Sequence, residues 1–224
     1  MPTIKTLVIS DTPSEWPYSS ENLAPKVDVF ILCGDLTQHG GLPSFQRAID
    51  NISAVDAELK LIIAGNHDVD IDPAWLYGRS STVNATPYTP KFGEIAFLYG
   101  KDEDRFNEGL SKMPEGVDIG ISNRPPAFPD FEGSKLNVSK RGEDCGCEKL
   151  VKALERVKLG LACFGHIQEG RGAAVMDWEA KELRSEGETS DRSVISLSGK
   201  DDQTILINAA VLGDERGWFV DLAT

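Results

Sequence analysis

Carboxylate, amide and imidazole side chains recur in this sequence directly after short hydrophobic runs. The residues of this kind are Asp11, Asp35, Asn66, Asn123 and His166, followed by Gln168. In an α/β fold, ligands bind outside the carboxyl ends of the strands, so these side chains are predicted to gather there. Their oxygen and nitrogen atoms are the donors that divalent metals take. Two aspartates at close range would be unfavourable without a cation between them, and a metal site is therefore predicted.

The sequence Gly65-Asn66-His67-Asp68 carries the densest set of such groups. It follows the apolar run at residues 59–63, which is short and bounded by polar residues, as a buried strand is. Taken alone, it is equally well explained as a polar turn whose histidine and aspartate cap local structure. Similar polar groups after other predicted strands favour the chemical interpretation.

The hydrophobic pattern predicts the elements that must position these groups. Strands are predicted at residues 6–10, 27–33, 59–63, 95–99, 117–122 and 159–164, and helices at 42–52 and 150–157. Their alternation favours a mostly parallel central sheet. Further strands are predicted at 173–178, 193–197, 204–209 and 217–222. A short helix around Trp75, a helix over 101–112 and an exposed, mobile insertion over 177–192 complete the prediction. The whole chain, residues 1–224, is expected to form a single domain.

The composition argues against several classes of function. Hydrophobic residues make up 40% of the chain, enough for a substantial core, and the formal net charge is −13. Nucleic-acid binding normally needs a basic surface, so no nucleic-acid partner is expected. An anionic substrate must then be attracted by local positive charge, from a metal or from arginines.

No membrane partner is expected, and a cytoplasmic location is predicted. No apolar run approaches the roughly 20 residues of a membrane span, and the first residues lead into a predicted strand rather than a signal peptide. The cysteines show no disulfide framework; they are Cys33, Cys145, Cys147 and Cys163. The first and last lie in predicted strands. The Cys145-Gly146-Cys147 pair is interpreted as ordinary reduced thiols, with redox or metal chemistry as the alternative.

In order and approximate spacing, these motifs resemble the calcineurin-like metallophosphoesterase superfamily. The family pattern runs D-x-H, GD, GNH[DE], a histidine often followed by P-P, and G-H-x-H. The matching residues are Asp11, Gly34-Asp35, Gly65 to Asp68, Pro125-Pro126 and Gly165-His166. The sequence is more closely similar to small metallophosphoesterase-domain proteins related to class III cyclic-nucleotide phosphodiesterases. The shared motifs are G-H-I-x-E-G-x-G at 165–172 and I-N-A at 207–209.

The resemblance implies an α/β fold, a four-layer αββα sandwich of the metallo-dependent phosphatase type. It also implies metal ions at the strand ends, with Asp35 in the bridging position, and a metal-activated water that attacks phosphorus. His67 would contact the phosphoryl oxygens or the leaving group. Asp68 would orient the ring of His67.

Three imidazole ligands of the family are missing, because Pro13, Asn123 and Gln168 stand in their places. Amide oxygens are poor ligands for Zn²⁺ and acceptable ones for Mg²⁺ or Ca²⁺. One ion, Mg²⁺ or Mn²⁺, is therefore expected at Asp35, Asn66 and His166. The remaining histidine, His39, is interpreted as an exposed loop residue, with replacement of a lost ligand as the alternative.

Arg124 stands beside this depleted site, where a glycine is common in the family. Its guanidinium is predicted to hold an anion, with exposure to solvent as the alternative. The favoured function is a divergent metal-dependent phosphoesterase acting on a small, anionic phosphorylated molecule. The alternatives are a non-phosphoesterase enzyme acting on a carbonyl- or carboxylate-containing metabolite, and an inactive pseudoenzyme.

Overall fold

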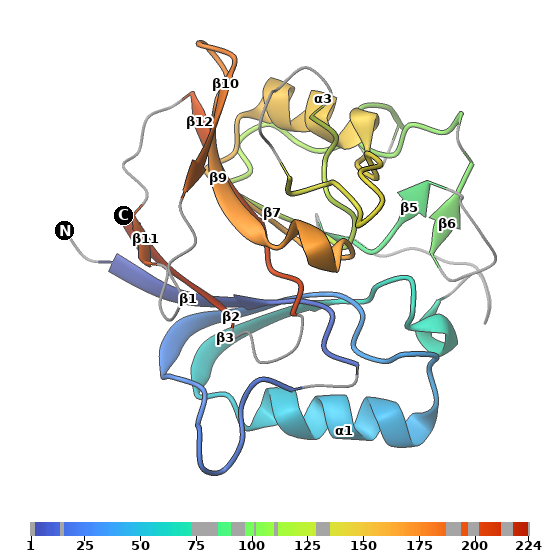
Figure 1. Ribbon diagram of the computed structural model, residues 1–224, viewed down its shortest axis with the longest axis vertical. Coiled ribbons are helices and arrows are strands. Elements are labelled where there is room, and N and C mark those ends of the chain that lie inside the picture. Colours follow the sequence, from blue (N-terminus) through green and yellow to red (C-terminus); the bar gives the residue numbers. More distant parts are fainter. Residues whose placement is uncertain are drawn as a thin grey trace.

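The computed structural model describes residues 3–13, 16–72, 85–90, 97–100, 102–109, 112–128, 135–186, 194–196, 202–211 and 217–223. Two large β-sheets pack face to face, and an α-helix covers the outer face of each (Figure 1). These layers confirm the predicted αββα sandwich. No helix within the described ranges is long and apolar enough to cross a membrane.

The first sheet contains the N-terminal strands. Its order is β11 (Val194–Ser196), β13 (Trp218–Ala223), β1 (Thr3–Ile9), β2 (Val27–Cys33) and β3 (Ala57–Ile63). β1, β2 and β3 run parallel, and β13 is antiparallel to β1. The helix α1 (Leu42–Ser53) has a proline in its first turn, where no donor is lost. Its buried face joins Ala48 and Ile52 to Phe30 and Leu32 of β2 in one apolar cluster.

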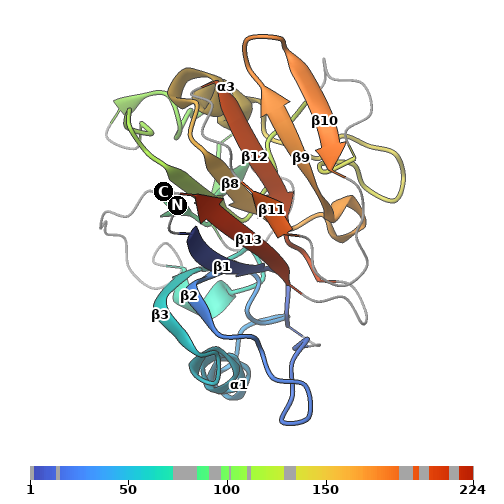
Figure 2. The same ribbon diagram turned by 90° about the vertical axis from the view of Figure 1, so that its left-hand side faces the viewer.

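Among the described residues, the second sheet contains six strands. Its order is β10 (Glu182–Glu186), β9 (Gly172–Asp177), β12 (Gln203–Asn208), β8 (Leu161–Phe164), β7 (Ile119–Ser122) and β4 (Ala85–Thr86). Four of these strands, β10, β9, β12 and β8, lie side by side in Figure 2. The helix α3 (Glu148–Val157) buries Leu150 and Leu154 against its outer face. β5 (Thr89–Pro90) and β6 (Leu98–Tyr99) form a separate parallel pair.

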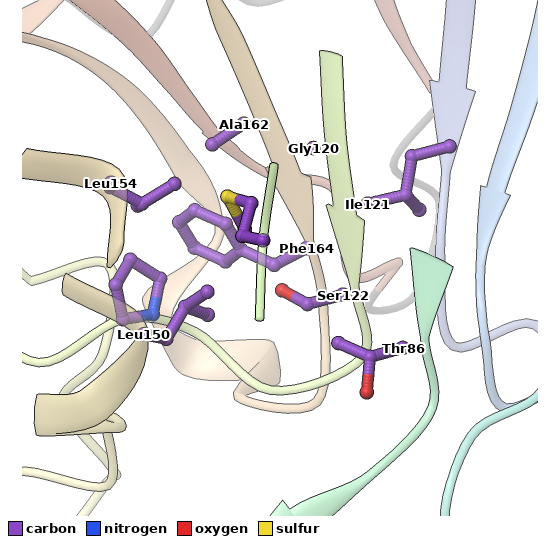
Figure 3. Close-up of a pocket in the computed structure, with 10 residues that line it drawn as sticks. Thr86, Gly120, Ile121, Ser122, Leu150, Leu154, Ala162 and Phe164 are labelled. Atoms are coloured by element: carbon purple, nitrogen blue, oxygen red, sulfur yellow. The ribbon is translucent and has the colours of Figure 1, made fainter. Parts of the chain in front are cut away.

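Under α3 the packing leaves one small apolar space. Leu150, Leu154 and Phe164 are among the side chains that surround it (Figure 3). Its volume is about 20 Å³, which is room for roughly one water molecule. This space is too small and too apolar to bind an anionic substrate.

The carboxyl ends of the parallel strands meet at one edge of the sandwich. Between the sheets, Cys33 and Cys163 lie in a shared apolar layer, at or near the ends of β2 and β8. Just beyond it, the backbone N–H of Asp11 donates to the Gly34 carbonyl at 3.1 Å, and that of Gly165 donates to the Asn123 carbonyl at 3.0 Å. Backbone hydrogen bonds therefore fix the loops that carry the predicted ligands.

Three predictions about the elements need correction. Residues 102–108 form turns and bends rather than a helix, and of the described part of the predicted strand at 95–99, Phe97 is a bend and Leu98–Tyr99 form β6. The region 177–192 is not simply a mobile insertion, because β10 pairs antiparallel with β9 and extends the sheet. The helix predicted around Trp75 lies outside the described residues.

Candidate metal site

Asp11 and Asp35 lie just beyond β1 and β2, and both are buried, with exposed fractions of 6% and 2%. Each carboxyl group influences the pKa of the other. Burial raises the pKa of both groups; for Asp35 the neighbouring charge of Asp11 adds to the rise, which is large. Two buried carboxyls in contact share a proton when no cation is present, and a divalent ion would take the place of that proton.

Three of the predicted ligands adopt a backbone conformation that residues other than glycine rarely take. The φ angles of Asp11, Asp35 and His166 are 57°, 53° and 69°. Such conformations cost of order 1–3 kcal/mol each and concentrate at functional sites. Here hydrogen bonds hold them: the N–H of His166 donates to Asp11 Oδ2 at 2.8 Å, and the N–H of His67 donates to Asp35 Oδ1 at 3.0 Å.

Steric contacts explain why the GNH and GH motifs contain glycine. A Cβ atom on Gly65 would collide with Asp35 Oδ1 and would lie 2.6 Å from Asn123 Nδ2. A Cβ atom on Gly165 would collide with Ser10 Oγ and Asp11 Oδ2. Only glycine lets these turns approach the carboxylates so closely.

Asn66 and Asn123 complete the polar lining. Both are buried, with exposed fractions of 1% and 0%. The amide nitrogen of Asn123 donates to the Cys33 carbonyl at 3.4 Å, but the Oδ1 atom of each asparagine has no hydrogen-bond partner among the described residues. Buried polar atoms are normally paired, so these two unpaired oxygens, on loops at the same edge as the two carboxylates, are candidate ligands for a cation.

His166 is suited to metal ligation by its protonation state. Burial, helped by the positive charge of Arg124, lowers its pKa to about 3, so its imidazole is neutral at physiological pH. The neutral ring is the form that binds metals. Gln168 begins the short helix η3 (Gln168–Gly170) and is half-buried. In the described chain, His, Cys, Asp and Glu side chains alone form no cluster of three or more for a metal, so a metal site here would require the asparagines.

Comparison with known proteins identifies the family of the chain. The model of the calcineurin-like phosphoesterase family matches residues 4–170. The chain belongs to this family. A probable rhamnogalacturonate lyase C from Emericella nidulans is 26% identical over 95% of the chain, and metallophosphoesterase domain-containing protein 1 from Homo sapiens is 27% identical over 73%. The chain spans only 23% and 60% of these two proteins.

A solved structure of a purple acid phosphatase from yellow lupin seeds also aligns with this phosphoesterase-family chain. The alignment covers 93% of the chain and 44% of the lupin protein, with 13% identity and a TM-score of 0.44.

Within this phosphoesterase-family site, His67 and Asp68 have separate roles. The Nδ1 atom of His67 lies 2.8 Å from the carbonyl oxygen of Gln38, so a backbone carbonyl orients the ring. The carboxylate of Asp68 instead accepts hydrogen bonds from the N–H groups of Leu36, Thr37 and Gly65 and from the Thr37 hydroxyl. The sequence prediction that Asp68 orients the ring is therefore wrong. The role of Gln38 carries no side-chain signal that the sequence could have shown.

Arg124 is tethered at the edge of the site rather than exposed to solvent. Its Nε donates to the Cys145 carbonyl at 2.6 Å, and burial lowers the pKa of its guanidinium. Its charge acts on His166. Arg171, by contrast, donates to the Ala210 carbonyl and lies over the Trp218 ring, which makes it part of the scaffold.

A cavity of about 160 Å³ lies between α1 and the outer face of the first sheet, and none of the predicted metal ligands lines it. Thr12 and Leu36, the residues that follow Asp11 and Asp35, line it together with Arg47 of α1. This space has the size of a small molecule and carries one positive charge.

Proposed function

We propose that this chain is a metal-dependent phosphoesterase that hydrolyses a small, anionic phosphorylated molecule with one bound Mg²⁺ or Mn²⁺ ion. The unpaired Oδ1 atoms of Asn66 and Asn123 beside the Asp11–Asp35 pair are the observation that carries the proposal. Family membership supports the class of reaction. We further propose that the protein acts in the cytoplasm.

The residues present fit a hard divalent cation. Asp35, Asn66, Asn123 and His166 would hold it, and Asp11 and Gln168 would complete its surroundings. When bound, the ion supplies a Lewis acid for the phosphoryl group and lowers the pKa of water. A set dominated by oxygen donors suits Mg²⁺ or Mn²⁺ better than Zn²⁺.

His67 and Arg124 act on the substrate in this proposal. Because Nδ1 of His67 faces the Gln38 carbonyl, the neutral ring carries its proton on Nδ1 and leaves Nε2 for a phosphoryl oxygen or a leaving group. Arg124 supplies the positive charge that an anion needs on a protein with a net charge of −13. Asp68 fixes the loops on which both Asp35 and His67 sit.

Two other functions remain as alternatives. An enzyme acting on a carbonyl- or carboxylate-containing metabolite would bind the metal without phosphoester turnover, and a pseudoenzyme would bind only a ligand or partner. The name of the fungal relative includes a lyase activity, but the chain matches less than a quarter of that protein. The matched family supports phosphoester hydrolysis first.

The test combines metal binding with turnover. Metal-free protein is titrated with Mn²⁺ by calorimetry, and hydrolysis of bis(4-nitrophenyl) phosphate is measured at saturating Mn²⁺. We expect one ion per chain, turnover that EDTA abolishes, and affinity lowered about tenfold or more in Asn66→Ala and Asn123→Ala. Asn51→Ala, outside the ligand set, is the control and should bind like the parent. Binding of two tight ions, or none, contradicts the single-ion site, and binding without turnover contradicts the phosphoesterase.

A further inference from the structure

The loop of residues 37–41, between β2 and α1, is held by several hydrogen bonds that involve side chains. The Thr37 hydroxyl donates to Asp68 Oδ1 at 2.9 Å and accepts the N–H of Gly40 at 3.0 Å. The N–H of Gly41 donates to Asp70 Oδ2 at 2.5 Å. Side chains from the segment after β3 therefore hold the loop from both ends.

Glycine at position 40 is part of the same fastening. Its φ is 74°, and a Cβ atom there would lie 2.8 Å from Asp70 Oδ2. A larger residue would be strained and would push the loop away from Asp70. The conformation of the loop is thus specified by the chain rather than left to solvent.

This fastened loop presents two groups to the site. The carbonyl of Gln38 orients His67, and the imidazole of His39 lies next to that of His67, with ring centroids 6.1 Å apart and planes inclined by 51°. His39 is exposed, whereas His67 is half-buried. A second imidazole therefore stands on the solvent side of the residue that faces the substrate.

Among the described residues, the ring of His39 contacts that of His67. Because His67 is proposed to contact the phosphoryl group, an exposed ring beside it is suited to the part of a phosphoester that leaves. Alkoxides are strong bases, so an ester of an ordinary alcohol needs a proton donor at that position.

We propose that His39 is the general acid that protonates the leaving-group oxygen of a phosphate ester of an alcohol. This inference rests on the proposed phosphoesterase function. As water forms the new P–O bond, the bond from phosphorus to the leaving oxygen breaks, and that oxygen takes the proton of the His39 imidazolium and departs as an alcohol. The proton lost by the attacking water returns to His39 through solvent.

The experiment compares two leaving groups in the parent and in His39→Gln at saturating Mn²⁺. 4-Nitrophenolate leaves as a stable anion and needs little protonation, whereas phenolate is more basic. We expect kcat for diphenyl phosphate to fall about 100-fold, the lower end of general-acid contributions, while kcat for bis(4-nitrophenyl) phosphate stays close to that of the parent. Leu42→Ala, an exposed residue at the start of α1, controls for disturbance of the loop.

Each other outcome overturns the proposal. Equal losses of kcat on both substrates would mean that His39 has a structural role. Equal rates in the parent and in His39→Gln would mean that His39 takes no part in the reaction. No turnover of either substrate by the parent removes the phosphoesterase itself, and with it the role of His39. The two failures are distinguishable, because only the last affects the parent.

Discussion

Two buried aspartates at neighbouring strand ends behave in opposite ways. Asp68 is fully buried and its carboxylate accepts hydrogen bonds from Leu36, Thr37 and Gly65 at 2.8 to 3.1 Å. Asp35 is equally buried, but it accepts one backbone N–H and faces the carboxyl of Asp11. The fold satisfies the carboxylate of Asp68 with several hydrogen bonds, whereas that of Asp35 accepts one backbone hydrogen bond among the described residues.

The difference shows that the GD and GNHD motifs place their aspartates in different environments. Asp68 ties the loop after β2 to the turn after β3, which places Asp35 and His67 beside each other. Burial raises the pKa of both Asp35 and Asp68, but the hydrogen bonds to Asp68 oppose the rise, whereas the charge of Asp11 adds to that of Asp35. Two aspartates from neighbouring loops thus differ in environment: Asp68 is held by hydrogen bonds of the fold, and Asp35 faces a second carboxyl group.

Removing the fastening carboxylate should have the largest effect. In Asp68→Ala the N–H groups of Leu36, Thr37 and Gly65 lose their partner, and each buried unpaired donor costs about 1–3 kcal/mol. We expect the free energy of unfolding to fall by about 3–5 kcal/mol. Urea denaturation in EDTA measures it, with exposed Asp102→Ala as control. A loss below about 1 kcal/mol would mean that the loops hold without Asp68.

Substitutions of Arg124 test whether the site around Asp35 binds an anion. Its guanidinium is held by the Cys145 carbonyl and acts on His166. We expect Arg124→Ala to weaken phosphate binding to the Mn²⁺-loaded protein by about 1.5–3 kcal/mol, the range for a charge-assisted hydrogen bond. Arg124→Lys should recover part, because lysine lacks the planar fork. Calorimetry with exposed Arg141→Ala as control decides; equal affinity of parent and Arg124→Ala would leave the arginine as a tether of the 145 loop.

The sequence predicts much of this fold because hydrophobic runs report buried strands directly. The predicted strand 27–33 coincides with β2, and helix 42–52 differs from α1 by one residue. Charged segments carry less information, which is why the helix over 101–112 was wrong and β10 was missed: pairing with β9 decides that strand, not its own composition.

The candidate site was predictable in part for a similar reason. Motif spacing placed Asp11, Asp35, Asn66, Asn123 and His166 at the strand ends, and the structure puts all of them on loops at that edge. The left-handed backbone of Asp11, Asp35 and His166 and the hold of the Gln38 carbonyl on His67 depend on tertiary contacts. No residue type in the sequence indicates these backbone conformations or this contact. The catalytic and ligand roles themselves stay predictions.

The smallest effect should also be the one with the opposite sign. In the metal-free protein, Asp35→Asn removes a charge that the fold buries against Asp11, and the new amide can donate to that carboxylate. We expect the free energy of unfolding at pH 7 to rise by about 1 kcal/mol, the usual size of the effect of a single substitution. Because the folded-state pKa of Asp35 lies above its ordinary value of 3.8, the folded protein binds the extra proton. The parent should therefore lose stability as pH rises from about 4, and Asp35→Asn should lose less.

Added metal should reverse the order of stability of the parent and Asp35→Asn. Added Mn²⁺ should stabilise the parent in proportion to its binding and leave Asp35→Asn nearly unchanged. Thermal unfolding in EDTA and in Mn²⁺, at several pH values, measures both effects, and exposed Asp102→Asn is the isosteric control. If Asp35→Asn is less stable than the parent in EDTA, then the Asp11–Asp35 contact is favourable without a cation. Asp35 would then resemble Asp68, and the unpaired asparagine oxygens alone would have to account for the metal.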